Sequence, residues 1–178
     1  MNIRIAYAND IDNIMKVEEA SFIPEIQEER NVFLERIKRC PELFLIFQED
    51  DSVAGYLSAE IMKTIPETAN EIKLGHLPNI NCNLTDDFEK NKSLYIYISS
   101  FAILPQYRGK GNGTKMWEDS LDYFKSHYGA EHFLLLVNEE WQSAYNIYKK
   151  SGFNVINNFK DFFFSDKNKT AAGIFMEM

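Results

Sequence analysis

The run Arg108-Gly109-Lys110-Gly111-Asn112-Gly113 is the feature that most constrains how this chain folds. It follows the apolar stretch Leu94 to Leu104 and precedes a helical pattern. A strand that ends in a glycine-rich turn opening a helix presents unpaired N–H groups at the positive end of the helix dipole, where anions are stabilised. Because glycines lack Cβ atoms and reach φ > 0, phosphate oxygens can approach these amides. The run therefore predicts a site for a phosphorylated ligand.

The spacing of the glycines excludes two common phosphate loops. A dinucleotide fingerprint needs a glycine where Thr114 stands, and the Walker A pattern is absent. What remains is R-x-x-G-x-G, made by Arg108, Gly111 and Gly113. This spacing resembles the acetyl-coenzyme A loop of the GNAT superfamily of acyltransferases. For a six-residue loop taken alone, an ordinary turn is the alternative.

A second segment extends the resemblance. Residues 144–153 are similar to the family's A-x-x-x-Y-x-K-x-G-F signature, with Tyr148 at the tyrosine and Gly152-Phe153 at its end. The two motifs are separated by a predicted helix and strand, as in the family, so specific motifs cover roughly residues 94 to 157. One departure is Trp141, which stands where many members carry an asparagine, and this puts one polar contact to the pantetheine arm in doubt.

The resemblance implies an α/β (α+β) fold of the GNAT type. It implies a central, mixed but mostly antiparallel sheet of about seven strands, with helices on both faces, in a single domain of residues 1–178. The fourth and fifth strands, Leu94 to Leu104 and His132 to Val137, are expected to splay apart and leave a slot. Ser99-Ser100 is the expected site of a bulge in the fourth strand.

Acetyl-coenzyme A is the cosubstrate that the resemblance implies, and an amine attacks its thioester directly. The pantetheine arm would bond to the backbone of Phe101, Ala102 and Ile103 in the slot. Tyr148 is the expected acid that protonates the leaving thiolate. The remaining expected cofactor-binding residues are Arg108, Gly109, Lys110, Gly111, Asn112, Gly113, Thr114 and Tyr145.

The general base stays open at this point. The stretches Phe33 to Ile37 and Cys40 to Leu43 resemble the serotonin N-acetyltransferase group, but Tyr97 and Ser99 stand where that group has two histidines on the fourth strand. A histidine mechanism therefore does not transfer. The alternatives are Glu29, Glu60 or a water chain through Tyr97.

Charge bears on the acceptor. Residues 1 to 62 carry 13 acidic and 6 basic side chains, a net of −7 out of −8 for the chain. In the family the helices after the first strand form one wall of the acceptor site, and Glu25, Glu28 and Glu29 fall there. They would attract a cationic amine, unless they form only a solvated helix face. We expect the acceptor to be a small cationic or arylalkyl amine. One alternative is an acceptor that is a protein N-terminus or lysine, and another is that the chain is a noncatalytic module that senses coenzyme A.

Composition limits the other possible partners. The acidic excess disfavours nucleic acid, and the absence of an apolar run of ~18 residues disfavours a membrane. We expect a cytoplasmic monomer or homodimer whose Cys40 and Cys82 are reduced. The segment Lys63 to Ser93 is predicted to be either an acceptor-site cover or a disordered insertion, and it carries His76, a weak candidate base.

Overall fold

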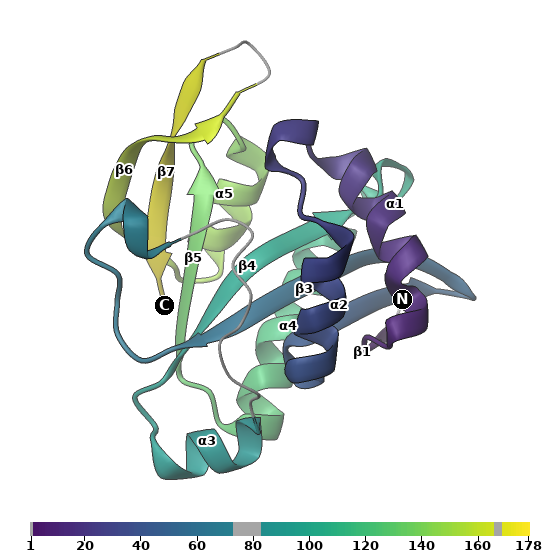
Figure 1. The fold of residues 1–178 in the computed structure, drawn as a ribbon, viewed down its shortest axis with the longest axis horizontal. Coiled ribbons are helices and arrows are strands. Elements are labelled where there is room, and N and C mark those ends of the chain that lie inside the picture. The colour runs from purple at the N-terminus through teal and green to yellow at the C-terminus, as the bar shows by residue number, and fades with distance from the viewer. Residues whose placement is uncertain (1, 73–82, 166–168) are drawn as a thin grey trace.

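The computed structural model describes residues 2–72, 83–165 and 169–178, and seven strands form one sheet in the order β1-β2-β3-β4-β5-β7-β6 (Figure 1). The strands are β1 Asn2–Ile5, β2 Phe44–Glu49, β3 Ser52–Met62, β4 Tyr95–Ile103, β5 His132–Asn138, β6 Asn154–Phe164 and β7 Thr170–Glu177. The helices are α1 Ile11–Ser21, α2 Arg30–Arg39, α3 Leu84–Lys90, α4 Asn112–Tyr128 and α5 Gln142–Lys150. All neighbouring strands are antiparallel except β4 and β5.

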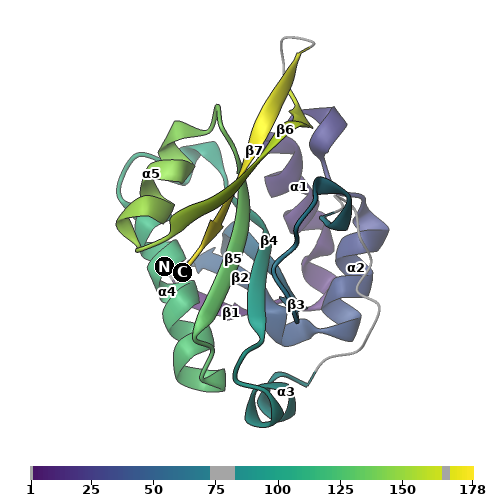
Figure 2. The ribbon, with the colours of Figure 1, turned by 90° about the vertical axis from the view of Figure 1, so that its left-hand side faces the viewer.

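Helices cover both faces of the sheet, as expected. Figure 2 shows α1 and α2 on one side and α4 and α5 on the other. In α1, Ile11, Ile14 and Val17 recur at helical spacing and are buried against α2 and the sheet. In α4, the buried face carries Trp117 and Phe124 and packs on the opposite side. The apolar faces of the helices thus pack on both faces of the sheet and bury it.

Strands β4 and β5 separate partway along their length. Their parallel pairing runs from Tyr95 with His132 to Ile98 with Leu135, while β4 continues to Ile103 and β5 to Asn138. On the other side of β4, Ile98 pairs with Ala59 and Ser100 with Ser58, so Ser99 is an extra residue in β4. The predicted splay and the predicted bulge at Ser99-Ser100 are both confirmed.

Several local expectations differ from the structure. The sequence pattern after the second motif predicts separate short strands at Phe153 to Ile156 and Asp161 to Phe164, but residues 154–164 form one strand, β6, whose register against β7 shifts twice. Asp161 at φ 56° is part of this irregularity, which made one bulged strand resemble two short ones. The expectation of reduced cysteines is wrong for Cys40, which is disulfide-bonded; Cys82 lies outside the described residues.

The described parts of the segment from Lys63 to Ser93 pack on the domain. Ile72 is buried beside Tyr97 and Phe175, and Leu84 and Phe88 of α3 are buried in the core under α4. No described residue of this segment lines the cavity discussed below. His76 lies outside the described residues. Within the described part of the chain, no helix has the length and apolar character needed to cross a bilayer.

Candidate active site

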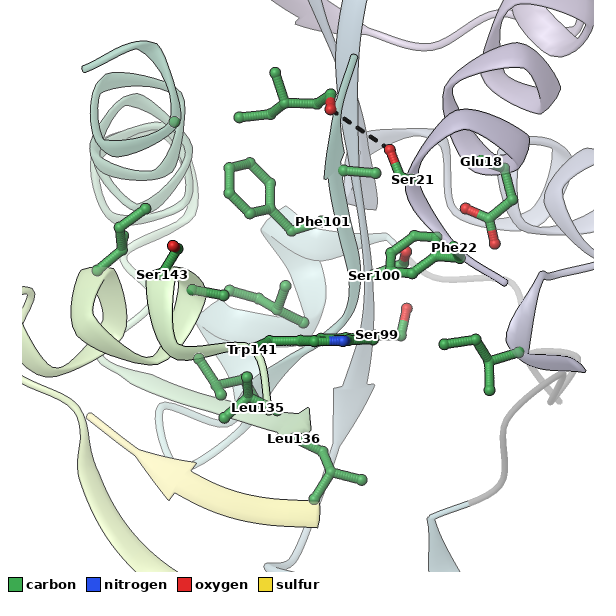
Figure 3. A pocket seen from close by; sticks show the side chains of 18 of the residues that line it. Glu18, Ser21, Phe22, Ser99, Ser100, Phe101, Leu135, Leu136, Trp141 and Ser143 are labelled. Atoms are coloured by element: carbon green, nitrogen blue, oxygen red, sulfur yellow. Dashed lines mark hydrogen bonds between the residues drawn. The ribbon is translucent and has the colours of Figure 1, made fainter. Parts of the chain in front are cut away.

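A cavity of about 1120 Å³ extends from the glycine-rich loop, through the gap between β4 and β5, to α1 and the start of α2 (Figure 3). We call the part at residues 108–114 the loop end. The carboxylate end is the part formed by Glu18, Glu28 and Arg36 with the neighbouring face of β4. The expected site residues that line the cavity are Phe101, Ala102, Ile103, Arg108, Gly109, Gly111, Gly113, Thr114 and Tyr148. Lys110, Asn112 and Tyr145 do not line it.

The loop end has the backbone that the glycine run predicts. Gly109 and Gly111 both have φ 79°, and Gly111 is the N-cap of α4. A Cβ added to either glycine would meet no atom within 4 Å, so the space over these amides is open. An open surface at the N-terminus of a 17-residue helix fits a diphosphate group. The residues present therefore fit the acetyl-coenzyme A that the motif implies.

Arg108 holds the loop in place. Its Nε donates to the Ile103 carbonyl oxygen at 2.7 Å, and one of its terminal nitrogens donates to Ser21 Oγ at 3.0 Å. Asn112 Nδ2 donates to the Tyr107 carbonyl oxygen at 2.9 Å. These bonds join the loop to the end of β4 and to α1. Arg108 thus fixes the loop against both of these elements.

Tyr148 of α5 lies in the wall of the cavity. Its ring centroid is 4.5 Å from that of Trp117, and burial raises the pKa of its phenol well above the ordinary value. Among the described residues, the Tyr148 hydroxyl has no hydrogen-bond partner. The phenol is therefore protonated at neutral pH, with its proton available to a group in the cavity.

The carboxylate end contains a buried acid that the sequence had not singled out, Glu18. One of its oxygens accepts a hydrogen bond from the Glu28 backbone N–H at 2.7 Å, and the other accepts from the Tyr56 hydroxyl. The Tyr56 oxygen lies 2.8 Å from Ser100 Oγ. Desolvation, the largest cause, raises the pKa of Glu18 to about 7, against the lowering effect of these hydrogen bonds and of Arg36.

The position of Glu18 in the sequence does indicate that its side chain is buried. It lies seven residues after Ile11 and four after Ile14, so it falls on the apolar face of α1. A carboxylate at such a position is expected to be buried. Charged residues are rarely fully buried unless they have partners. Its partner Tyr56 comes from β3, and the Ser100 hydroxyl that bonds to Tyr56 comes from β4, so no local pattern predicts these contacts.

Arg36 of α2 forms a second buried polar group beside Glu18. Its guanidinium lies 3.3 Å from a Glu28 carboxylate oxygen and 3.1 Å from one of Glu60. The same side chain donates to the hydroxyls of Ser58 and Ser99, each at 3.4 Å. The positive charge of Arg36 is therefore opposed by two carboxylates in the carboxylate end.

The three earlier candidates for the base differ in position. Glu29 is exposed and lines the cavity, whereas Glu60 does not line it. Tyr97 lines the cavity but is buried, and desolvation, with the Glu60 charge as a smaller cause, raises its pKa far above the ordinary value. An ionised Tyr97 is thus strongly disfavoured at neutral pH.

Aromatic rings bridge the carboxylate end. Trp141, the residue before α5, lies 5.5 Å between ring centroids from Phe22 and also 5.5 Å from Phe163 of β6. All three side chains belong to residues that line the cavity, and Figure 3 shows Trp141 and Phe22 next to the two serines of β4. The indole that replaces the family's asparagine is thus part of an apolar wall.

Comparison with known proteins agrees with this geometry. The sequence model of the acetyltransferase (GNAT) family matches residues 11–153, which include both motifs and every element around the cavity except β6 and β7. The chain belongs to the acetyltransferase (GNAT) family. It is an acetyl-coenzyme A-dependent N-acyltransferase, and acetyl-coenzyme A is its cosubstrate.

The sequence identity to individual relatives is modest. The chain is 28% identical to an N-alpha-acetyltransferase of Sulfurisphaera tokodaii over 86% of its own length and 80% of the relative's. It is 26% identical to an N-alpha-acetyltransferase of Saccharolobus solfataricus over 90% and 84%. The loading GNATL domain of CurA from Lyngbya majuscula superposes with a TM-score of 0.76, covering 99% of this chain and 96% of that one, at 14% identity. The last likeness concerns the fold alone.

Proposed function

We propose that this enzyme transfers the acetyl group of acetyl-coenzyme A to the α-amino group at the N-terminus of a polypeptide. One observation carries the choice of acceptor. The relatives named N-alpha-acetyltransferase match the chain over 86% and 90% of its length, and so across the elements of the carboxylate end as well as the loop. This favours a protein N-terminus over the small cationic or arylalkyl amine that the charge pattern alone suggests.

The carboxylate end suits an N-terminal amine and its first side chain. Glu18, Glu25, Glu28 and Glu29 line this part of the cavity and attract a cationic ammonium group. The Phe22–Trp141–Phe163 wall provides apolar area beside them. A charged amine joined to a polypeptide can use both features, because its first side chain lies close to the amine.

The chain's own residues have distinct roles in the proposal. The amides at the start of α4, with Gly109, Gly111 and Gly113, hold the diphosphate, and Arg108 keeps the loop in position. The backbone of Phe101 to Ile103 orients the pantetheine arm, and an N–H there stabilises negative charge on the thioester oxygen. Asn112 supports the loop through its bond to the Tyr107 carbonyl oxygen, Tyr145 packs against the core, and Lys110 is exposed beside the loop glycines.

Tyr148 supplies the proton for the leaving group. The amine nitrogen forms a bond to the carbonyl carbon while the carbon–sulfur bond breaks. The sulfur leaves as a thiolate and takes the proton of the Tyr148 phenol, which solvent then replaces. The buried, protonated state of Tyr148 suits this donation.

The test measures release of free coenzyme A thiol with matched acceptors. The acceptors are a lysine-free peptide with a free N-terminus, a peptide with a blocked N-terminus and one lysine, and an arylalkyl amine. We expect turnover with the first and at most weak turnover with the others. Fragment mass spectrometry of the product should place the acetyl group on the α-nitrogen. Faster turnover of the lysine peptide or of the arylalkyl amine would contradict the proposal.

A further inference from the structure

The reaction requires a route for a proton, and the described structure contains one. An ammonium group cannot attack a thioester, so the acceptor amine, with a pKa near ~8 at a polypeptide N-terminus, must lose a proton. Among the hydroxyls in the cavity wall, Ser100 Oγ bonds to a buried phenol that itself bonds to a buried carboxylate. These three groups come from three different elements, β4, β3 and α1.

We infer that Ser100, Tyr56 and Glu18 form a proton relay, in which Glu18 is the final acceptor of the proton that the acceptor amine loses. The inference rests on the acetyl transfer proposed above. It concerns only the proton of the amine and so applies to any amine that the enzyme acetylates. Ser100 contacts the substrate, whereas Tyr56 and Glu18 act through it.

The hydrogen bonds give the relay a direction. An ionised Glu18 only accepts, so the single hydrogen of Tyr56 points to Glu18. The Tyr56 oxygen is then free to accept, and the Ser100 hydrogen points to it. The lone pairs of Ser100 Oγ therefore remain for a donor in the cavity. Each hydroxyl is already oriented to pass a proton toward Glu18.

The transfer balances without ionising either hydroxyl. The amine gives a proton to Ser100 Oγ, Ser100 gives its own proton to Tyr56, and Tyr56 gives its proton to Glu18. The net change is one proton lost by the amine and one gained by Glu18. Only Glu18 changes charge, and its raised pKa of about 7 makes it a better match to an amine than an ordinary carboxylate.

The position of Ser100 follows from the bulge. Residue Ser100 directly precedes Phe101, whose backbone lines the slot, and Figure 3 shows Phe101 on one side of β4 and Ser100 on the other, facing α1. A proton leaving an amine at the slot therefore meets Ser100 first. The extra residue Ser99 in β4 sets this register against β3.

The charged groups around Glu18 set the pH at which the relay works. From the segment before α2, the Glu28 carboxylate raises the Glu18 pKa; from α2, Arg36 lowers it. Glu60 of β3 faces Arg36, and Tyr56 of β3 faces Glu18 directly. Because Glu18 must be ionised to accept the proton, turnover should fall as the pH drops through about 7.

The experiment compares pH profiles of kcat/KM for the wild-type enzyme, E18Q, Y56F and S100A, using whichever amine the wild type turns over. At pH 7.5 or so, we expect each variant to lose roughly a hundredfold in kcat/KM, the contribution of a general base. The acid limb of the wild type should reflect one proton, that of Glu18, because the relay itself removes the proton of the amine. In E18Q the amine must lose its proton to solvent before it attacks, so the limb should move up to the pKa of the amine, near ~8, and the deficit should shrink at high pH.

S58A is the matched control. Ser58 is a buried serine on the same strand as Tyr56 that bonds to Arg36 and Ser99 but does not line the cavity. We expect its kcat/KM to stay near the wild-type value with an unchanged pH profile. An E18Q profile whose acid limb stays at the wild-type position near pH 7 would overturn the relay, as would S58A matching the loss of S100A. Absence of turnover by the wild type with every amine would instead contradict the proposed function.

Discussion

The loop end of the cavity presents main-chain groups, whereas the carboxylate end presents buried side chains. At the loop end, two glycines with φ 79° and the first amides of α4 leave an open anion site within a few consecutive residues. At the carboxylate end, the polar groups come from α1, α2, β3 and β4 and meet only in the folded chain. A ligand common to a family can be bound by a local backbone motif, while the acceptor side depends on long-range packing.

The largest effect is expected at the carboxylate end, where loss of a single side chain leaves buried charges. Arg36→Ala removes the partner of Glu28 and Glu60, and the Arg36 side chain is only 6% exposed. Removing one member of a buried ion pair costs about 3–5 kcal/mol. We therefore expect Arg36→Ala to lower the free energy of unfolding by that amount, measured by denaturant titration.

Arg39→Ala is the matched control on the same helix. Its pair with Glu35, at 3.0 Å, is one-third exposed on both sides, and such pairs contribute about 0.2–1 kcal/mol. If both substitutions lower the free energy of unfolding equally, burial of the Arg36 ion pairs does not add to their contribution to stability.

The loop end should respond to backbone changes more than to loss of side chains. Gly111→Val places a β-branched residue at φ 79°, so the loop must move and the amides lose their alignment. Loss of two such bonds to a charged group, at about 1.5 kcal/mol each, weakens binding by roughly a hundredfold. Isothermal titration calorimetry with acetyl-coenzyme A measures this change.

Gly129→Val provides the control for strain alone. Gly129 has φ 66° at the other end of the same helix and does not line the cavity. We expect it to lower the melting temperature while leaving acetyl-coenzyme A binding intact. Equal loss of binding in both variants would mean that Gly111 matters only for folding.

Tyr148 in the cavity wall tests whether a side chain also serves the donor half of the reaction. Tyr148→Phe should lower kcat by about 10² and leave acetyl-coenzyme A affinity nearly unchanged, since only the donated proton is lost. Tyr145→Phe, three residues earlier on the same helix and outside the cavity lining, should keep normal turnover. Unchanged kcat in Tyr148→Phe would remove its role as the acid.

The same contrast explains what the sequence could predict. The strand, loop, helix and strand from residue 95 to residue 138 were expected with nearly the observed bounds, because apolar periodicity and glycine spacing are local signals. Helix α4 begins at Asn112, inside the glycine-rich run and not after it, because the low helix propensity of Gly111 and Gly113 obscures its start in the sequence. Helix α3 was not expected, because its seven residues carry only two buried apolar side chains.

The candidate site divides in the same way. The cavity wall contains Tyr148, the slot backbone and the glycines, all of which were named from motifs. Glu18 was missed, since its burial depends on Tyr56 and Ser100, which are distant in sequence. The bulge at Ser99 was expected, but its consequence, that Ser100 reaches Tyr56, depends on the register between β3 and β4.

The most gradual expected effect is the pH dependence of stability at the carboxylate end. The pKa of Glu18 is about 7 in the folded protein and about 4.5 when the chain is unfolded, so between these values the folded state binds the extra proton. Stability therefore falls as the pH rises from about 4.5 to about 7, and the deficit persists above that range. Glu18→Gln removes this titration, and its free energy of unfolding relative to the wild type should rise across the same interval by up to roughly 3 kcal/mol. Denaturant titrations of both proteins at a series of pH values measure the difference.

A flat difference curve would mean that Glu18 has the same pKa in the folded and unfolded states. A rising curve together with the loss of turnover would show that the carboxylate end keeps an ionisable group at a cost in stability.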